Sequence, residues 1–150
     1  VLEAEVCVVT SQPAESLPEG VKKITMDEAF ATSAVVSLHC PLKPENKAFV
    51  NAELLSKARK GLVLINTARG GLIDENAVAE ALHSGHLVAY ACDVLAQEPP
   101  AADNPILSAP NAYVTPHIAW AGAAARGRII SIMADNLEAF LAGTPQNVVS

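Results

Sequence analysis

The stretch Gly61-Leu-Val-Leu-Ile-Asn-Thr-Ala-Arg-Gly-Gly-Leu-Ile-Asp74 decides the fold class of this chain. It opens with a short apolar run of branched side chains at 62–65, which is typical of a buried strand in a parallel sheet. Gly70 and Gly71 then indicate a turn, because glycine accepts positive φ and lets another group approach the backbone. Asp74 is a suitable N-cap for a helix that follows. Strand, turn and capped helix form half of a βαβ unit.

Strands and helices alternate along the rest of the chain. Apolar runs predict strands at 6–9, 21–24, 35–38, 62–65, 87–94 and 113–115, and caps and helical spacing predict helices at 26–31, 51–58, 74–85 and 122–142. The proline-rich segment 96–111 is expected to be a long loop. In the last helix, an apolar stripe predicts core packing: Ile129, Met133, Leu137, Phe140 and Leu141. The alternation predicts an α/β fold, a doubly wound parallel sheet.

Composition bounds the class of protein. The chain has 150 residues, 51% hydrophobic and 17% charged, which suffices for one domain with a core. Its net charge of −6 argues against a nucleic-acid partner, because phosphate binding needs clustered Lys and Arg. No apolar run approaches the ~18 residues of a membrane span, so no membrane partner is expected.

Three cysteines and the start of the chain bear on the cellular compartment of the protein. Cys7, Cys40 and Cys92 form no C-x-x-C pair, which favours buried free thiols in a reducing compartment. With no secretory leader at the start, a cytoplasmic location is expected. The chain begins at Val1 without Met. We therefore expect residues upstream, or a fragment of a longer protein.

Polar residues stand at the ends of the predicted strands. They are His39, Asn66, Arg69, Asp93, Glu98 and His117. Each alone has an ordinary structural explanation: a solvated arginine, a turn-capping aspartate, a histidine satisfied in the core. Ligand sites of open parallel sheets lie beyond the carboxyl ends of the strands. The six polar residues are expected to share this edge, which favours a functional site there.

This set of side chains suits reduction of a 2-keto acid by hydride. Arg69 can hold the substrate carboxylate with a bidentate fork and polarise the carbonyl. The developing alkoxide needs a proton, which an imidazolium can give. A neighbouring carboxylate favours the charged imidazole, and Glu98 is the candidate. No H-x-x-x-H pair or Cys/His cluster predicts a metal site, and no G-x-S-x-G elbow predicts a nucleophilic serine.

Four motifs carry a family resemblance. In order and spacing, the segments 36–42, 65–74, 93–99 and 115–119 resemble the D-isomer-specific 2-hydroxyacid dehydrogenases. The segments 103–107 and 117–120 look most like the glycerate dehydrogenase (hydroxypyruvate reductase) branch. The resemblance implies a Rossmann-like NAD-binding domain and an oxidoreductase. Its hydride transfer would run between NAD(H) and a small D-2-hydroxy acid or 2-keto acid, such as glycerate or hydroxypyruvate.

The resemblance also implies roles for single residues. Arg69 would bind the substrate, His117 would be the acid/base, and Glu98 its partner. Asp93 would hold the nicotinamide carboxamide, and Ala119 would lie near the nicotinamide. The cofactor-binding residues would be His39, Pro41, Thr67, Ala68, Arg69, Asp93, His117 and Ala119.

The chain also departs from the family pattern. The family's glycine-rich pyrophosphate loop and the preceding substrate domain are absent from the sequence. Residues 1–150 would then be the C-terminal part of a single NAD-binding domain, without its first βα unit. Thr10-Ser11-Gln12 stands where NAD-using members usually carry an acidic residue, so NAD is the default cofactor and NADP stays open. The full-length protein would be a homodimer.

Two rival functions come from the same family. Formate dehydrogenases pair the histidine with glutamine, and Glu98 argues against them. The other rival is a catalytically silent nucleotide-sensing or interaction module, like the family's transcriptional corepressors, or an inert truncated product. Such corepressors retain all three candidate catalytic residues, so the sequence leaves this alternative open.

Overall fold

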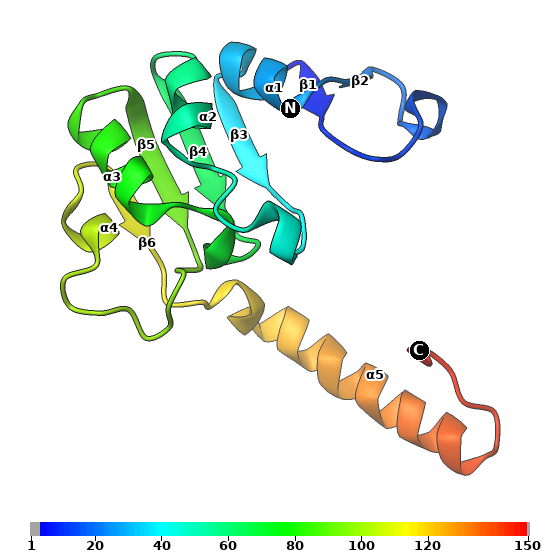
Figure 1. Ribbon diagram of the computed structural model, residues 1–150. Helices are drawn as coiled ribbons and strands as arrows, with labels where there is room; N and C mark the ends of the chain where they lie inside the picture. The colour runs from blue at the N-terminus through cyan, green and yellow to red at the C-terminus, as the bar shows by residue number, and fades with distance from the viewer. Residues whose placement is uncertain (1–3, 150) are drawn as a thin grey trace. The chain divides into compact units, whose positions relative to one another are not determined.

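The computed structural model describes residues 4–149, whose contacts group into one unit up to Pro116 and a second from His117 onward (Figure 1). The strands are β1 (Val6–Val8), β2 (Val21–Lys23), β3 (Val35–Leu38), β4 (Leu62–Asn66), β5 (Leu87–Cys92) and β6 (Ala112–Val114). The α-helices are α1 (Met26–Thr32), α2 (Ala52–Lys57), α3 (Glu75–His83), α4 (Pro105–Ser108) and α5 (Ala123–Leu141). Short 3-10 helices are η1 (Ala14–Ser16), η2 (Pro44–Asn46), η3 (Gly70–Leu72) and η4 (Ala119–Ala121).

The strands of the first unit form two parallel sheets. β1 pairs with β2, and the larger sheet has the order β3-β4-β5-β6. The register aligns Leu38 with Asn66, Asn66 with Cys92, and Cys92 with Val114. All these pairs are parallel, so the strands of the larger sheet end at one edge. The predicted α/β fold with parallel strands is confirmed.

The larger sheet has one covered face. Period-two alternation places Leu64 and Tyr90 on the same face as Asn66 and Cys92, and all four are buried. The helices α1, α2, α3 and α4 pack side by side in this order, and their apolar side chains share one core with this face. Val35 and Tyr113 belong to the opposite face, where they are 53% and 63% exposed.

The predicted helix ends are confirmed by their caps. The Asn51 side chain accepts a hydrogen bond from the Leu54 amide at 3.0 Å, so α2 begins as expected. Asp74 Oδ1 accepts from the amides of Asn76 and Ala77 at the start of α3. Gly85, with φ +68°, follows the last turn of α3 and takes the left-handed conformation of a helix end.

The largest differences from the sequence prediction lie in and after β5. β5 ends at Cys92, two residues before the predicted end, and α4 lies inside the predicted loop 96–111. The Asn104 side chain accepts from the Ile106 amide at 3.0 Å, and Pro105 occupies the first helical turn. An N-cap followed by proline is itself a helix-start signal, although the four prolines of the segment favoured a loop.

The prediction of buried thiols holds only for Cys92. Cys7 is exposed and Cys40 half-buried. Cys7 lies in β1, whose own residues are mostly exposed because β1 belongs to a separate two-stranded sheet.

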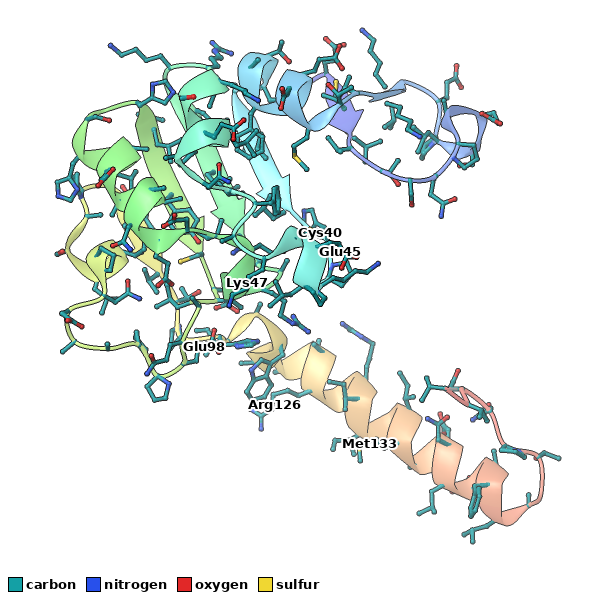
Figure 2. The ribbon with its side chains drawn as sticks, viewed as in Figure 1. Cys40, Glu45, Lys47, Glu98, Arg126 and Met133 are labelled. Atoms are coloured by element: carbon teal, nitrogen blue, oxygen red, sulfur yellow. The ribbon has the colours of Figure 1, made fainter. Side chains whose placement is uncertain are left out.

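The core packing predicted for the last helix is not found within the second unit. No residue of α5 is buried; Met133 is 61% exposed and Phe140 69%. Figure 2 shows Arg126 and Met133 projecting from α5. In the described part of the second unit, the regular elements are η4 and α5, so the unit supplies no second apolar layer for the stripe. Among residues 4–149, no helix combines the length and apolar character that a bilayer span requires.

Candidate active site

Asn66 shapes the turn after β4. Its side chain is fully buried. Its Nδ2 donates to the carbonyl oxygen of Arg69 at 3.0 Å, and its Oδ1 accepts from the amide of Ala68 at 3.1 Å. The turn leaves Thr67 and Arg69 exposed at the carboxyl edge of the sheet. Arg69 Nη1 donates to the carbonyl oxygen of Ala68 at 2.6 Å, which ties one end of the guanidinium to its own turn.

Asp93 lies directly after β5 and is 5% exposed. Its amide donates to the carbonyl oxygen of Asn66 at 3.1 Å. The hydroxyl of Thr115, which follows β6, donates to the Asp93 carboxylate. A carboxylate is therefore fixed between the ends of three neighbouring strands.

Glu98 stands five residues beyond Asp93. Its side chain turns back toward β5, and Oε1 accepts from the amide of Leu95 at 3.0 Å. The residue is exposed, and Figure 2 shows it beyond the carboxyl ends of the strands of the first unit. The peptide bond from Glu98 to Pro99 is cis. The backbone of Gly70 touches that of Leu95, so the structure brings together the loops that carry Arg69 and Glu98.

His39 and Pro41 follow β3 at the same edge, and both are exposed. His39 Nε2 lies 2.9 Å from the hydroxyl oxygen of Ser37. The carbonyl oxygen of Pro41 accepts from Asn46 Nδ2 at 2.8 Å. The predicted site residues of the first unit thus share one sheet edge: His39, Pro41, Thr67, Ala68, Arg69, Asp93 and Glu98.

His117 and Ala119 belong to the second unit. His117 is exposed and has φ +52°, a left-handed conformation uncommon for residues other than glycine. Its carbonyl oxygen accepts from Trp120 Nε1 at 2.7 Å. Ala119 begins η4. The pairing of His117 with Glu98 stays a prediction.

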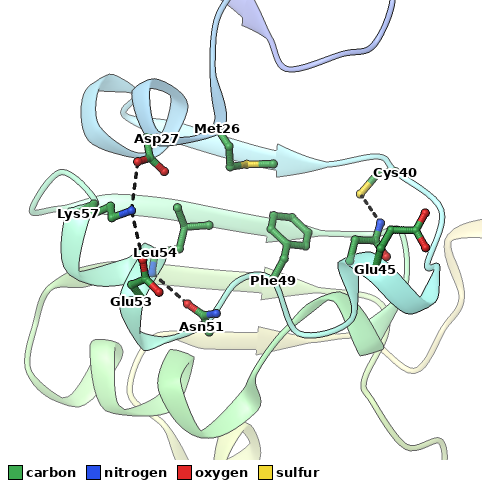
Figure 3. A pocket seen from close by; sticks show the side chains of 10 residues that line it. Met26, Asp27, Cys40, Glu45, Phe49, Asn51, Glu53, Leu54 and Lys57 are labelled. Carbon is green, nitrogen blue, oxygen red and sulfur yellow. Dashed lines mark hydrogen bonds and ion pairs between the residues drawn. The ribbon is translucent and has the colours of Figure 1, made fainter.

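A surface pocket of about 500 Å³ lies between α1, α2 and the segment after β3 (Figure 3). Lys57 joins two of its acidic side chains, at 3.1 Å from Asp27 and 3.4 Å from Glu53. Cys40 is the lining residue closest in sequence to the predicted site, and the predicted site residues are not part of its lining. The pocket depends on how two helices pack, which no motif in the sequence signals.

Sequence reasoning missed Glu75. This first residue of α3 is half-buried, and its carboxylate accepts from the amide of Ala96 and from Asn104 Nδ2, both at 2.9 Å. An acidic residue directly after an N-cap ordinarily serves the helix dipole, so its position gave no sign of a second role. Among the described residues, no group of three or more His, Cys, Asp and Glu side chains could hold a metal ion.

Residues 1–119 match the family described as the NAD-binding domain of D-isomer-specific 2-hydroxyacid dehydrogenases. The chain belongs to this family. It is 43% identical to hydroxypyruvate reductase of Blautia hydrogenotrophica over 88% of its own length and 41% of that protein's. It is 45% identical to glycerate dehydrogenase of Methylorubrum extorquens over 84% of its length and 41% of that protein's. The chain thus spans about two fifths of these dehydrogenase relatives.

A solved dehydrogenase structure shows the same fold. D-lactate dehydrogenase with NAD⁺ from Lactobacillus jensenii has a TM-score of 0.90 and 26% identity, over 98% of this chain and 48% of that one. This similarity confirms the Rossmann-like fold class.

The residues at the sheet edge fit the nicotinamide end of the family's cofactor. An amide needs an acceptor for its N–H groups and a donor for its oxygen. The Asp93 carboxylate, held by Thr115, supplies acceptor oxygens, and the exposed Thr67 follows the adjacent strand with a hydroxyl.

Proposed function

We propose that this chain is the C-terminal part of a single NAD-binding domain in a longer dehydrogenase, which interconverts a small 2-keto acid and its D-2-hydroxy acid. We propose hydroxypyruvate and glycerate as the natural pair. The observation that carries the proposal is the meeting of the Arg69 and Glu98 loops at the carboxyl edge of the sheet. The two curated relatives named above, at 43% and 45% identity, support the substrate pair.

Arg69 is the substrate-binding residue in this proposal. Its guanidinium is exposed at the sheet edge, where a planar fork can hold a carboxylate through two parallel hydrogen bonds. The same charge polarises the neighbouring keto group and stabilises the negative charge that develops on its oxygen.

His117 and Glu98 handle the proton. NADH supplies the hydride that the keto carbon receives. His117, as an imidazolium, donates its proton to the carbonyl oxygen, which leaves a hydroxyl on the product and a neutral imidazole on the enzyme. Glu98 favours the protonated imidazole, because a nearby negative charge stabilises a positive one.

The remaining site residues hold the cofactor. Asp93 accepts hydrogen bonds from the nicotinamide carboxamide. The cofactor groove is lined by His39, Pro41, Thr67, Ala68 and Ala119.

The setting is also part of the proposal. The free cysteines favour a reducing compartment, for which we propose the cytoplasm. For the full-length protein we propose a homodimer. The relatives named above are enzymes, so the corepressor-like alternative gains no support.

The test is NADH oxidation by the purified full-length protein with hydroxypyruvate, glyoxylate and pyruvate. We expect the highest kcat/KM with hydroxypyruvate, and reduction of NAD⁺ in reverse with D-glycerate but not with L-glycerate. NADPH in place of NADH tests the cofactor. Absence of turnover with every 2-keto acid would contradict the proposed activity, whereas preference for another keto acid would contradict only the substrate pair.

A further inference from the structure

Glu75 fixes both ends of the loop that carries Glu98. One carboxylate oxygen accepts from the amide of Ala96, two residues before Glu98, and the other accepts from Asn104 Nδ2, each at 2.9 Å. Asn104 is 9% exposed and caps α4. The loop between these anchors is exposed and contains consecutive prolines, so it holds little apolar contact of its own. A single half-buried side chain on α3 therefore joins α3, the Glu98 loop and the start of α4.

The same loop is held against the turn of Arg69. A Cβ added to Gly70 would lie 1.9 Å from the carbonyl carbon of Leu95, so the two backbones are in direct contact. One step upstream, the amide of Asp93 donates to the carbonyl oxygen of Asn66. The segment from the end of β4 to the start of α3 thus meets the segment after β5 at three successive places: Asn66 with Asp93, Gly70 with Leu95, and Glu75 with Ala96.

We propose that Glu75 is a positioning residue of the dehydrogenase, which holds Glu98 at a fixed place relative to Arg69; the inference rests on the proposed function. Two consecutive amides of the loop are each bound by a carboxylate: Leu95 by Glu98 and Ala96 by Glu75. Glu98 is exposed, so burial does not fix it. Without Glu75, the Ala96 amide and the Asn104 side chain lose their acceptor, and the turn that orients Glu98 can relax.

The test compares four single variants and one double variant of the full-length enzyme with the wild type. Glu75→Ala removes both acceptor oxygens. Asn104→Ser removes the amide that donates to Glu75 while keeping a side-chain oxygen for the helix cap. It is therefore a milder change, made at the partner of Glu75. Glu98→Gln is the reference for loss of the carboxylate itself. Glu80→Gln is the matched control, because Glu80 is exposed on the same helix.

We expect kcat for hydroxypyruvate to fall by about 10- to 100-fold in Glu75→Ala and less in Asn104→Ser, since a misplacement of about 1 Å can cost such a factor. The pH at which reduction fades should move down, as in Glu98→Gln, while KM for NADH stays unchanged. Combining Glu75→Ala with Glu98→Gln should add little to Glu98→Gln alone, because both act through one group. Glu80→Gln should match the wild type.

The outcomes separate the two proposals. A wild type inactive toward every 2-keto acid refutes the proposed function, and the positioning role with it. An active wild type whose Glu75→Ala and Asn104→Ser variants keep the kcat and pH profile refutes the positioning role alone. Fully additive losses in the double variant also refute it. Should Glu75→Ala fail to fold, Asn104→Ser decides by the same criteria.

Discussion

Asn66 shows how a buried polar residue can shape a candidate site through the backbone of its own turn. Its amide is fully buried, and an unpaired amide there would cost about 1–3 kcal/mol. Both of its ends are paired within the turn, with Arg69 and Ala68. The hydrogen bonds of Asn66 therefore fix the shape of the turn, and this shape leaves Arg69 exposed. Sequence reasoning placed Asn66 at the site, but its role became visible only with its burial and partners.

The first prediction concerns Arg69. Arg69→Lys keeps the charge but loses the planar fork that binds a carboxylate by two bonds. We expect kcat/KM for keto acids to fall roughly 10- to 100-fold, as one lost charge-assisted hydrogen bond of about 1.5–3 kcal/mol requires, with NADH affinity nearly unchanged. Steady-state kinetics beside NADH titration checks this. An equal loss in NADH affinity would mean that Arg69 is a cofactor or structural residue.

The second prediction treats His117 and Glu98 as one unit. Loss of the proton donor in His117→Ala should lower the reduction rate by roughly 10²–10⁴-fold. Glu98→Gln should lower the pH at which reduction fades, because the imidazolium loses the negative charge that keeps it protonated at higher pH. The pH–rate profile of reduction is the measurement. An unchanged profile in Glu98→Gln would refute the pairing.

At the scale of elements, local signals were sufficient where they agreed with packing. The two ends of α3 could be predicted from Asp74 and Gly85, because an N-cap and a left-handed glycine act within one turn of the chain. The packing of α5 could not be predicted in this way. Its apolar spacing specifies a face, but not what covers that face, and Leu137 is 59% exposed. Within the part of the chain that the structure describes, β1 pairs only with β2, and local signals do not determine which strands pair.

The third prediction contrasts two adjacent glycines of the turn. In Gly70→Ala the new Cβ would lie within 2.0 Å of Leu95 backbone atoms, which cannot move without displacing the Glu98 loop. In Gly71→Ala it would meet only the flexible tip of the Leu42 side chain, at 2.8 Å. We expect a loss of stability of about 1–3 kcal/mol or more in Gly70→Ala, as for overpacking, and little in Gly71→Ala. Urea unfolding of the full-length variants checks this. Equal stabilities would contradict the contact.

The fourth prediction concerns Tyr90 in β5. Burial raises the pKa of its hydroxyl above the ordinary value of 10.0. The unfolded chain then releases this proton at lower pH than the folded chain, so stability is present below that ordinary pKa and falls as pH rises above it. Tyr90→Phe should reduce the loss of folding stability at alkaline pH. Urea midpoints of both proteins across about pH 8 to 11 test this. Parallel pH dependences would contradict it.

At the scale of the whole molecule, topology explains how far the candidate site could be predicted. Parallel strands end at one edge, so the grouping of His39, Arg69 and Asp93 follows from strand order alone. Which side chains hold which loop does not follow, because Glu75 reaches Ala96 across 21 residues of sequence. Strand order does not show which side chain pairs with His117 either, so its pairing with Glu98 stays a prediction.

The last prediction concerns the 150-residue chain by itself. β1–β2 and β3–β6 are separate sheets, so each leaves strand edges with unpaired backbone groups in the described residues (Figure 1). Val35, Tyr113 and Phe140 add exposed apolar surface. Such edges and surfaces favour association.

The family resemblance places the pyrophosphate loop and the substrate domain upstream of Val1. If the function is as we propose, the described residues hold only the nicotinamide end of the cofactor, and few contacts remain to offset the translational freedom lost on binding. We expect a marginally folded, self-associating chain without dehydrogenase activity and with weak NADH binding, against an active full-length control. Calorimetric titration with NADH, size-exclusion chromatography and a hydroxypyruvate assay measure the three properties. A monomer that melts cooperatively and binds NADH with micromolar affinity would show that the described site is sufficient.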